Sequence, residues 1–264
     1  MRKRGLAVPG PFRIVKCGSC AHHYVDPRIS DEDLGTIYGD AYYHGQGFDR
    51  GINFFGEPDE ALQLAIERIV TMVAGLARRP FGELEWLDYG CGSGNLLSVV
   101  AKRGAQAVGY DFGDPPRKIC AAKGLKTLEE DELAGRSGTF DVVSAIEVIE
   151  HVPDPRLFLQ QLASLLKVGG VLYVQTGNWN LIRHVPGRPY IMPEGHIQYF
   201  TPPTMRRLFA GSGLREADVL NVSWAGYKLA GRFPGAPALI RLFERFLRAA
   251  APGYAQFPVG IRVA

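Results

Sequence analysis

The chain has 264 residues, of which 46% are hydrophobic and 22% are charged, and its formal net charge is +3. This length suits one large domain or a catalytic domain with an appendage, and the sequence contains no apolar run of 18 residues that would predict a transmembrane helix. The mild charge does not indicate nucleic-acid binding, which usually needs a concentrated basic stripe, and the Pro- and Gly-rich start does not resemble a signal peptide, so we expect a cytoplasmic protein without a nucleic-acid partner.

Helices and strands are predicted to alternate after an irregular N-terminal segment, 1–57, so that residues 58–264 form the main domain. Apolar residues at spacings of three and four predict helices at 58–79, 95–103, 115–123, 155–166 and 202–212. Short apolar runs predict strands at 84–88, 107–111, 125–128, 140–146, 171–175 and 257–263, and a further segment lies around 220–224. Gly169 and Gly170 are expected to end the helix at 155–166. The pattern indicates an α/β, doubly wound, Rossmann-like fold with a seven-stranded, mostly parallel sheet and helices on both faces.

The densest signal is a glycine-rich turn between the first of these strands and the helix at 95–103. It reads Asp88-Tyr89-Gly90-Cys91-Gly92-Ser93-Gly94. Alternate glycines give a bare backbone on which a nucleoside-sized ligand can lie, and the following helix N-terminus favours a carboxylate. Asp111 ends the next strand, where an acid can accept hydrogen bonds from both ribose hydroxyls. Together these features predict a ligand that contains adenosine.

The spacing of the glycines distinguishes between two cofactors that contain adenosine. A nicotinamide-dependent oxidoreductase would show G-x-G-x-x-G, but here the third glycine comes one place early and Asn95 stands at the expected position. Asp88 just ahead of the turn is poorly placed beside a pyrophosphate and well placed beside an ammonium and a sulfonium. The pattern therefore favours S-adenosylmethionine over NAD. The plainer alternative is a tight strand-to-helix turn that binds no ligand.

The turn resembles the first motif of the class I S-adenosylmethionine-dependent methyltransferases, and further segments resemble their later motifs in the same order. These segments are 108–111, 140–155, 165–172, and His196 with 199–214. The last of them is similar to a block of the subgroup related to ubiquinone-pathway O-methyltransferases. The resemblance covers roughly residues 60–215, which makes it far more specific than one motif.

The resemblance implies a cofactor site at the carboxyl ends of the strands. It implies that the turn holds the methionine end, Asp111 the ribose and Phe112 the adenine, with the end of the fourth strand alongside. The implied cofactor-binding residues are Asp88, Gly90, Gly92, Gly94, Asp111, Phe112, Ile146 and Glu147.

Two carboxylates and an imidazole follow the fourth strand in the sequence Glu147-Val148-Ile149-Glu150-His151. His151, with Glu150, is a candidate general base that takes a proton from the acceptor. Alternatively, Glu147, Glu150, His151 and His196 hold Mg²⁺, Mn²⁺ or Zn²⁺, since oxygen ligands with imidazole suit these ions and a similar segment binds a divalent ion in small-RNA 2′-O-methyltransferases. In the third interpretation these side chains only cap and pack locally.

The N-terminal segment contains Cys17 and Cys20, and it resembles the second half of a zinc ribbon found ahead of some methyltransferases. One Cys-x-x-Cys supplies two of the four ligands that structural zinc needs, so two reduced thiols in a turn are the favoured interpretation. The Tyr- and Gly-rich stretch 38–48 is a candidate lid over the cofactor.

We therefore expect a methyltransferase that acts on a small-molecule acceptor, with O-methylation favoured. The alternatives are a metal-dependent RNA 2′-O-methyltransferase and a methyltransferase-like binding domain without turnover. The sequence does not name the acceptor or the oligomeric state, and it leaves open the role of the amphipathic stretch at 239–248.

Overall fold

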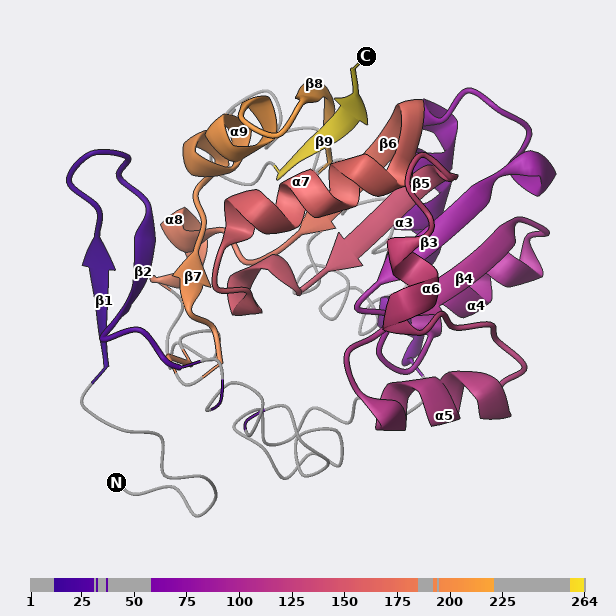
Figure 1. The fold of residues 1–264 in the computed structure, drawn as a ribbon, viewed down its shortest axis with the longest axis horizontal. Coiled ribbons are helices and arrows are strands. Elements are labelled where there is room, and N and C mark those ends of the chain that lie inside the picture. The colour runs from indigo at the N-terminus through magenta and orange to yellow at the C-terminus, as the bar shows by residue number, and fades with distance from the viewer. Residues whose placement is uncertain are drawn as a thin grey trace.

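A computed structural model describes residues 12–30, 32, 37, 58–184, 192–193, 195–220 and 257–263. Its largest feature is a six-stranded sheet with the order β4-β3-β5-β6-β9-β8 (Figure 1). The strands are β3 (Glu85–Tyr89), β4 (Gln106–Tyr110), β5 (Phe140–Ile146), β6 (Leu166–Gln175), β8 (Leu214–Leu220) and β9 (Phe257–Arg262). β9 pairs antiparallel with both neighbours, and the pairings among β4, β3, β5 and β6 are parallel.

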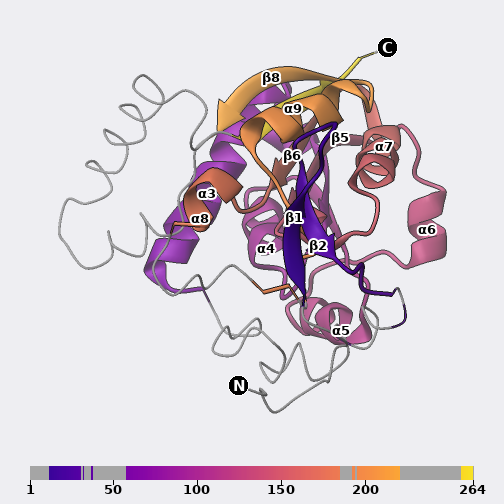
Figure 2. The same ribbon diagram turned by 90° about the vertical axis from the view of Figure 1, so that its left-hand side faces the viewer.

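Helices cover both faces of this sheet, as predicted (Figure 2). The helices of the described residues are α3 (Glu60–Leu76), α4 (Asn95–Lys102), α5 (Asp114–Ala122), α6 (Glu130–Ala134), α7 (Pro155–Leu165), α8 (Trp179–Ile182) and α9 (Pro202–Ala210), with single turns η1 (Phe81–Glu83) and η2 (Ile149–His151); α8 packs against the small N-terminal sheet. The strands supply both cores because successive side chains point to opposite faces. Trp86 packs with α3 and α4, whereas its neighbour Leu87 packs with α7 and α9.

The sheet differs from the prediction at one edge. The expected strand at 125–128 makes a single parallel bridge, from Thr127 to Gly109, in the described part of the chain. This segment runs directly into the capping box of Glu129 that starts α6, so it is too short to add a second pair. The prediction of seven strands therefore becomes six strands and one bridge.

The glycines predicted to end a helix lie inside a strand instead. α7 ends at Leu165, and Leu166 already has extended backbone and pairs with Phe140. The pairing register then shifts before Val171, and Gly169, with φ of 82°, lies in that irregularity. Gly169 and Gly170 therefore allow β6 to bulge, because a Cβ at Gly170 would lie 2.9 Å from the Lys167 carbonyl oxygen.

A second, small sheet joins the N-terminal segment to the main domain. β1 (Arg13–Lys16) and β2 (His23–Asp26) form a hairpin, and β2 also pairs antiparallel with β7 (Gln198–Tyr199). Its core includes Val25, Ile29, Trp179, Ile197 and Tyr199. In Figure 1 the hairpin lies at the side of the molecule that carries α8, α9 and β7.

Two predicted features, the lid at 38–48 and the amphipathic stretch at 239–248, lie outside the described residues. None of the helices in the described part of the chain is long and apolar enough to cross a membrane.

The amino ends of β3 and β5 are tied together by Asp141, which is buried. Its carboxylate accepts hydrogen bonds from Arg79 Nη1 (2.8 Å), the Glu85 backbone N–H (2.9 Å) and Lys167 Nζ (3.0 Å). Burial alone would raise the pKa of Asp141, but these hydrogen bonds outweigh it and the pKa is lowered. The ionised form therefore stabilises the fold.

Replacing Asp141 by Asn should lower the free energy of unfolding by about 1–3 kcal/mol, because the hydrogen bonds to a charged group are lost. Urea denaturation measures this loss. Glu216→Gln is the matched control: Glu216 pairs with Arg206 at 2.9 Å on the surface, and its loss should cost less than about 0.5 kcal/mol. Equal losses in the two variants would contradict the structural role of Asp141.

Candidate functional site

The predicted glycine turn connects β3 to α4 at the carboxyl edge of the sheet. Gly90, Gly92 and Gly94 have φ angles of 73°, 51° and 76°, in the left-handed region. At two of these positions space also requires glycine, since a Cβ would lie 2.4 Å from Val148 Cγ2 at Gly90 and 2.6 Å from Leu125 Cδ1 at Gly94. The turn is therefore fixed by both backbone conformation and close packing.

The turn is held against the end of β4, which is followed by Asp111, the residue predicted to bind the ribose. The backbone N–H groups of Gly90 and Cys91 donate to the Tyr110 carbonyl oxygen at 2.7 and 3.0 Å. The Gly92 N–H donates to Asp111 Oδ2 at 2.8 Å. The structure thus brings the glycine turn and Asp111 together, and Phe112 beside them is 74% exposed.

Asp88 lies beneath the turn, buried at the end of β3. Its Oδ1 accepts a hydrogen bond from Ser144 Oγ at 2.8 Å, and that hydroxyl also accepts one from Trp86 Nε1 at 3.0 Å. The pKa of Asp88 is raised to about 7, mainly by burial; the hydrogen bond from Ser144 lowers it, and the charge of Asp111 adds to the increase. Asp88 is therefore poised to ionise when a cation lies near it.

Sequence reasoning missed Ser144 and Gly109 as supports of the turn. Ser144 is a polar residue in an otherwise apolar strand, and that break in the pattern was its signal. Gly109 packs against the turn from β4, where a Cβ would lie 2.7 Å from Cys91 Sγ. Cys91 Sγ in turn lies 4.0 Å from Cys120 Sγ, and both thiols are buried.

A carboxylate and two imidazoles meet at the short turn η2, which follows β5. Glu150 and His151 lie on η2, and His196 comes from the segment before β7. The ligand atoms of all three lie within 4.8 Å of one another. Glu150 is fully buried and His196 is 4% exposed. We call these three residues the carboxylate–imidazole cluster.

A backbone hydrogen bond fixes the orientation of His151. Its Nδ1 lies 3.0 Å from the carbonyl oxygen of Gly195, an atom that can only accept, so Nδ1 carries the proton. The lone pair is then on Nε2, which can take a proton or bind a cation. The rings of His151 and His196 lie edge to face with their centroids 4.8 Å apart.

Glu147, predicted as a fourth ligand, is outside this cluster. It has a left-handed φ of 55°, and its N–H donates to the Gln175 carbonyl oxygen at 2.8 Å. This hydrogen bond joins the Glu147 backbone to the end of β6, and the charge of Glu147 adds to the effect of burial in raising the pKa of Tyr173. The structure therefore brings together three of the four predicted metal ligands, while Ile146 and Glu147 stay at the carboxyl end of β5.

The donor set of the cluster suits a divalent cation. A carboxylate that is fully buried needs a proton, a cation or a hydrogen-bonding partner to offset its loss of water. One carboxylate oxygen and two imidazole nitrogens are ligands that Mn²⁺ and Zn²⁺ accept readily.

The Cys17–Cys20 turn has a different character. A hydrogen bond from the Ser19 side chain, followed by backbone N–H groups of Cys20 and Ser19, lowers the pKa of Cys17 to about 6. Within the described residues no group of three metal-ligating side chains includes either cysteine. Neither cysteine forms a disulfide, and the favoured interpretation of two reduced thiols in a turn stays a prediction.

Comparison with known proteins shows which family this chain belongs to. The model of a methyltransferase domain family matches residues 50–217. The ubiquinone biosynthesis O-methyltransferase of Parvibaculum lavamentivorans is 35% identical over 165 residues, which are 56% of this chain and 65% of that protein. The protein of the same name from Vibrio parahaemolyticus is 32% identical over 156 residues, or 52% and 66% of the two chains. The match thus spans slightly less than two thirds of each relative.

Solved structures share the fold at lower identity. Magnesium protoporphyrin IX methyltransferase from Synechocystis, with SAH bound, has a TM-score of 0.59 and 19% identity over 86% of this chain and 99% of that chain. An S-adenosylmethionine-dependent methyltransferase from Mesorhizobium loti has a TM-score of 0.52 and 16% identity over 73% and 96% of the two chains. With the family model covering more than half of its length, this chain belongs to the methyltransferase domain family.

Proposed function

We propose that this protein transfers a methyl group from S-adenosylmethionine to a hydroxyl oxygen of a small molecule. The observation that carries the proposal is the hydrogen bond between Gly92 and Asp111, which joins the glycine turn to an acid at the carboxyl ends of β3 and β4. Ligands of open α/β sheets bind at this edge, and the arrangement offers a bare backbone and a ribose acceptor side by side.

In this proposal the cofactor lies across the turn. Asp111 accepts hydrogen bonds from the ribose hydroxyls, and the exposed ring of Phe112 offers a face to the adenine. The backbone of 90–94 and the start of α4 receive the methionine end, whose ammonium and sulfonium lie near Asp88. Ile146 and Glu147 line the cofactor from the end of β5.

The acceptor is placed beside the carboxylate–imidazole cluster. The acceptor oxygen attacks the methyl carbon in line as the carbon–sulfur bond breaks, S-adenosylhomocysteine leaves, and the hydroxyl proton goes to His151 Nε2. Glu150 and His196 surround that imidazole and stabilise its charged form. If the cluster holds a divalent ion, that ion supplies Lewis-acid polarisation of the acceptor oxygen.

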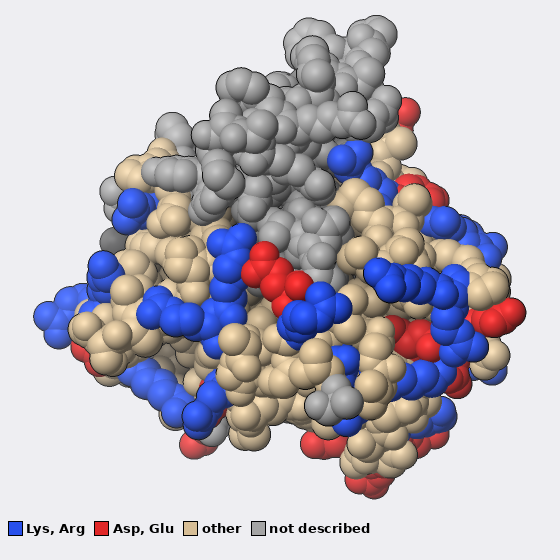
Figure 3. All heavy atoms as spheres, turned by 90° about the horizontal axis from the view of Figure 1, so that it is seen from above, with Lys and Arg blue, Asp and Glu red and all other residues tan. Residues whose placement is uncertain are grey.

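A small hydroxylated acceptor is favoured over RNA. The relatives from Parvibaculum and Vibrio are named O-methyltransferases of ubiquinone biosynthesis, which supports a small acceptor. On the face shown in Figure 3, Lys and Arg are scattered among acidic and uncharged residues rather than gathered in one stripe.

The cytoplasm remains the expected location.

Asp111→Asn should weaken the binding of S-adenosylmethionine and S-adenosylhomocysteine about 10- to 100-fold, since a charged acceptor of two hydrogen bonds is lost. Isothermal titration calorimetry measures both affinities. Asp114→Asn is the matched control, because it removes an exposed acid three residues away that pairs with Arg117. Unchanged affinity in Asp111→Asn, or no binding by the wild-type protein, would contradict the cofactor site.

His151→Ala should lower kcat about 10²- to 10⁴-fold and leave the affinity for S-adenosylmethionine unchanged, because the proton acceptor is lost while the glycine turn is intact. Transfer of a labelled methyl group to a panel of small hydroxyl compounds, phenols among them, measures this. His184→Ala, at an exposed histidine, is the control.

Loss of activity with EDTA that Mg²⁺ or Mn²⁺ restores would assign a metal to the cluster. Binding without transfer in the wild-type protein would support a non-catalytic domain instead.

The affinity for S-adenosylmethionine should rise as the pH rises from 6 to 8. The pKa of Asp88 is about 7 in the free protein, and a cationic ligand prefers the ionised carboxylate, so binding releases a proton below pH 7. The gain should approach tenfold per pH unit below the pKa and level off above it. In Asp88→Asn this component should vanish. A wild-type affinity that falls or stays level over this range would contradict a cation-facing Asp88.

A further inference from the structure

The segment that carries His196 is held between two parts of the chain. On one side the Ile197 N–H donates to the Glu150 carbonyl oxygen at 2.9 Å, and the Gly195 carbonyl oxygen lies 3.0 Å from His151 Nδ1. On the other side the Val25 N–H of β2 donates to the Ile197 carbonyl oxygen at 3.0 Å. The segment thus links η2, which carries Glu150 and His151, to the N-terminal hairpin.

This segment has little regular structure of its own. β7 contains only Gln198 and Tyr199, and its strand partner among the described residues is β2. A two-residue strand is not stable without its neighbours. The hairpin therefore helps to position His196, whose own N–H donates to the Met192 carbonyl oxygen at 2.7 Å.

Two side chains strengthen this link. His22 Nε2 lies 2.8 Å from Gln198 Oε1, and Gln198 Nε2 donates to the carbonyl oxygens of Val152 and Pro153 at 3.4 and 3.3 Å. Gln198 therefore bridges the hairpin turn and the chain that leaves η2. Because the Gln198 amide oxygen can only accept, His22 donates through Nε2, and burial lowers the pKa of His22, which favours the neutral ring.

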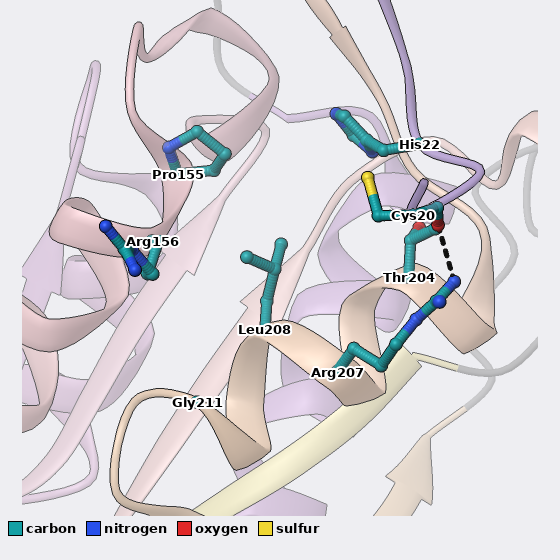
Figure 4. A pocket seen from close by; sticks show the side chains of 8 residues that line it. All are labelled: Cys20, His22, Pro155, Arg156, Thr204, Arg207, Leu208 and Gly211. Atoms are coloured by element: carbon teal, nitrogen blue, oxygen red, sulfur yellow. Dashed lines mark hydrogen bonds between the residues drawn. The ribbon is translucent and has the colours of Figure 1, made fainter. Parts of the chain in front are cut away.

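The hairpin turn is itself anchored to the main domain. Arg207 on α9 donates to the Cys20 carbonyl oxygen at 2.6 Å, the bond drawn in Figure 4. The ring of His22 also lies 4.8 Å from that of Phe200, between centroids. The turn, α9 and the start of α7 line an open pocket of about 210 Å³, whose walls include His22, Leu208 and Arg156. The hairpin is thus a fixed part of the domain at this point.

We propose that His22 and Gln198 are positioning residues, through which the β1–β2 hairpin holds the loop that carries His196 against η2. This inference rests on the proposed function, since positioning has meaning only if the carboxylate–imidazole cluster acts on the acceptor. It assigns to the N-terminal segment a role in the site that is separate from a lid or a zinc turn.

Amide hydrogen exchange of the ligand-free full chain tests the structural step. In His22→Ala and Gln198→Ala, exchange in a peptide covering 195–200 should become at least about tenfold faster, because the Ile197 N–H loses its support, while exchange over 85–100 stays unchanged. His22→Gln, which keeps an N–H donor, should restore protection. Arg13→Ala is the control, because it breaks an exposed 4.0 Å pair with Asp26 at the open end of the hairpin.

Kinetics of the same variants test the functional step. Both alanine variants should lower kcat about 10- to 100-fold with the affinity for S-adenosylmethionine within twofold of wild type, and His22→Gln should recover most of the loss. Unchanged exchange at 195–200 in both alanine variants would overturn the inference, as would faster exchange with an unchanged kcat. If the wild-type protein binds no S-adenosylmethionine, the proposed function fails, and the exchange measurement still decides whether the hairpin holds the loop.

Discussion

The close approach of Gly90 to Val148 is the constraint on which the candidate site depends. A side chain at position 90 would lie 2.4 Å from Val148 Cγ2, so the glycine turn can pack directly on the residue that precedes η2. Because η2 carries Glu150 and His151, this contact sets the turn and the cluster side by side at the carboxyl edge of the sheet. A methyl donor on the turn and an acceptor at the cluster would then be neighbours.

The supports of this contact come from three neighbouring strands, on which Asp88 is paired with both Ser144 and Gly109. Ser144 and Asp88 hold the turn from β5 and β3, and Gly109 lets β4 approach it. At the far edge, Asp141 ties the amino ends of β3 and β5 to Arg79 and Lys167. The strands therefore present their carboxyl ends in a fixed arrangement. A pre-formed site of this kind avoids the entropy cost of ordering its own residues when the ligand binds.

Much of this arrangement could be predicted from the sequence, because it rests on local patterns. The apolar run along 140–146 and the spacing of apolar residues in the helices predicted the elements, and the glycine turn with Asp111 predicted where the cofactor site lies. His196 was placed near His151 from a family pattern rather than from spacing. The backbone hydrogen bond from Glu147 to the end of β6 could not be predicted, because Glu147 has a left-handed backbone although it is not a glycine.

The pairing of β2 with β7 was also beyond sequence reasoning. Two residues of strand carry no periodic signal, and His22 and Gln198 are 176 residues apart in the chain. The boundary between the N-terminal segment and the main domain, placed between residues 57 and 58 from composition, remains a prediction. The third predicted strand failed because the capping box at Glu129 begins a helix where the strand would have had to continue.

The most direct test of the account is a crystal structure of the protein with S-adenosylhomocysteine. The account predicts the ribose hydroxyls within hydrogen-bonding distance of the Asp111 carboxylate, and the sulfur on the side of the turn that faces Glu150, His151 and His196. An adenosyl group bound elsewhere, or a sulfur directed away from the carboxylate–imidazole cluster, would contradict the account that this edge of the sheet carries out methyl transfer.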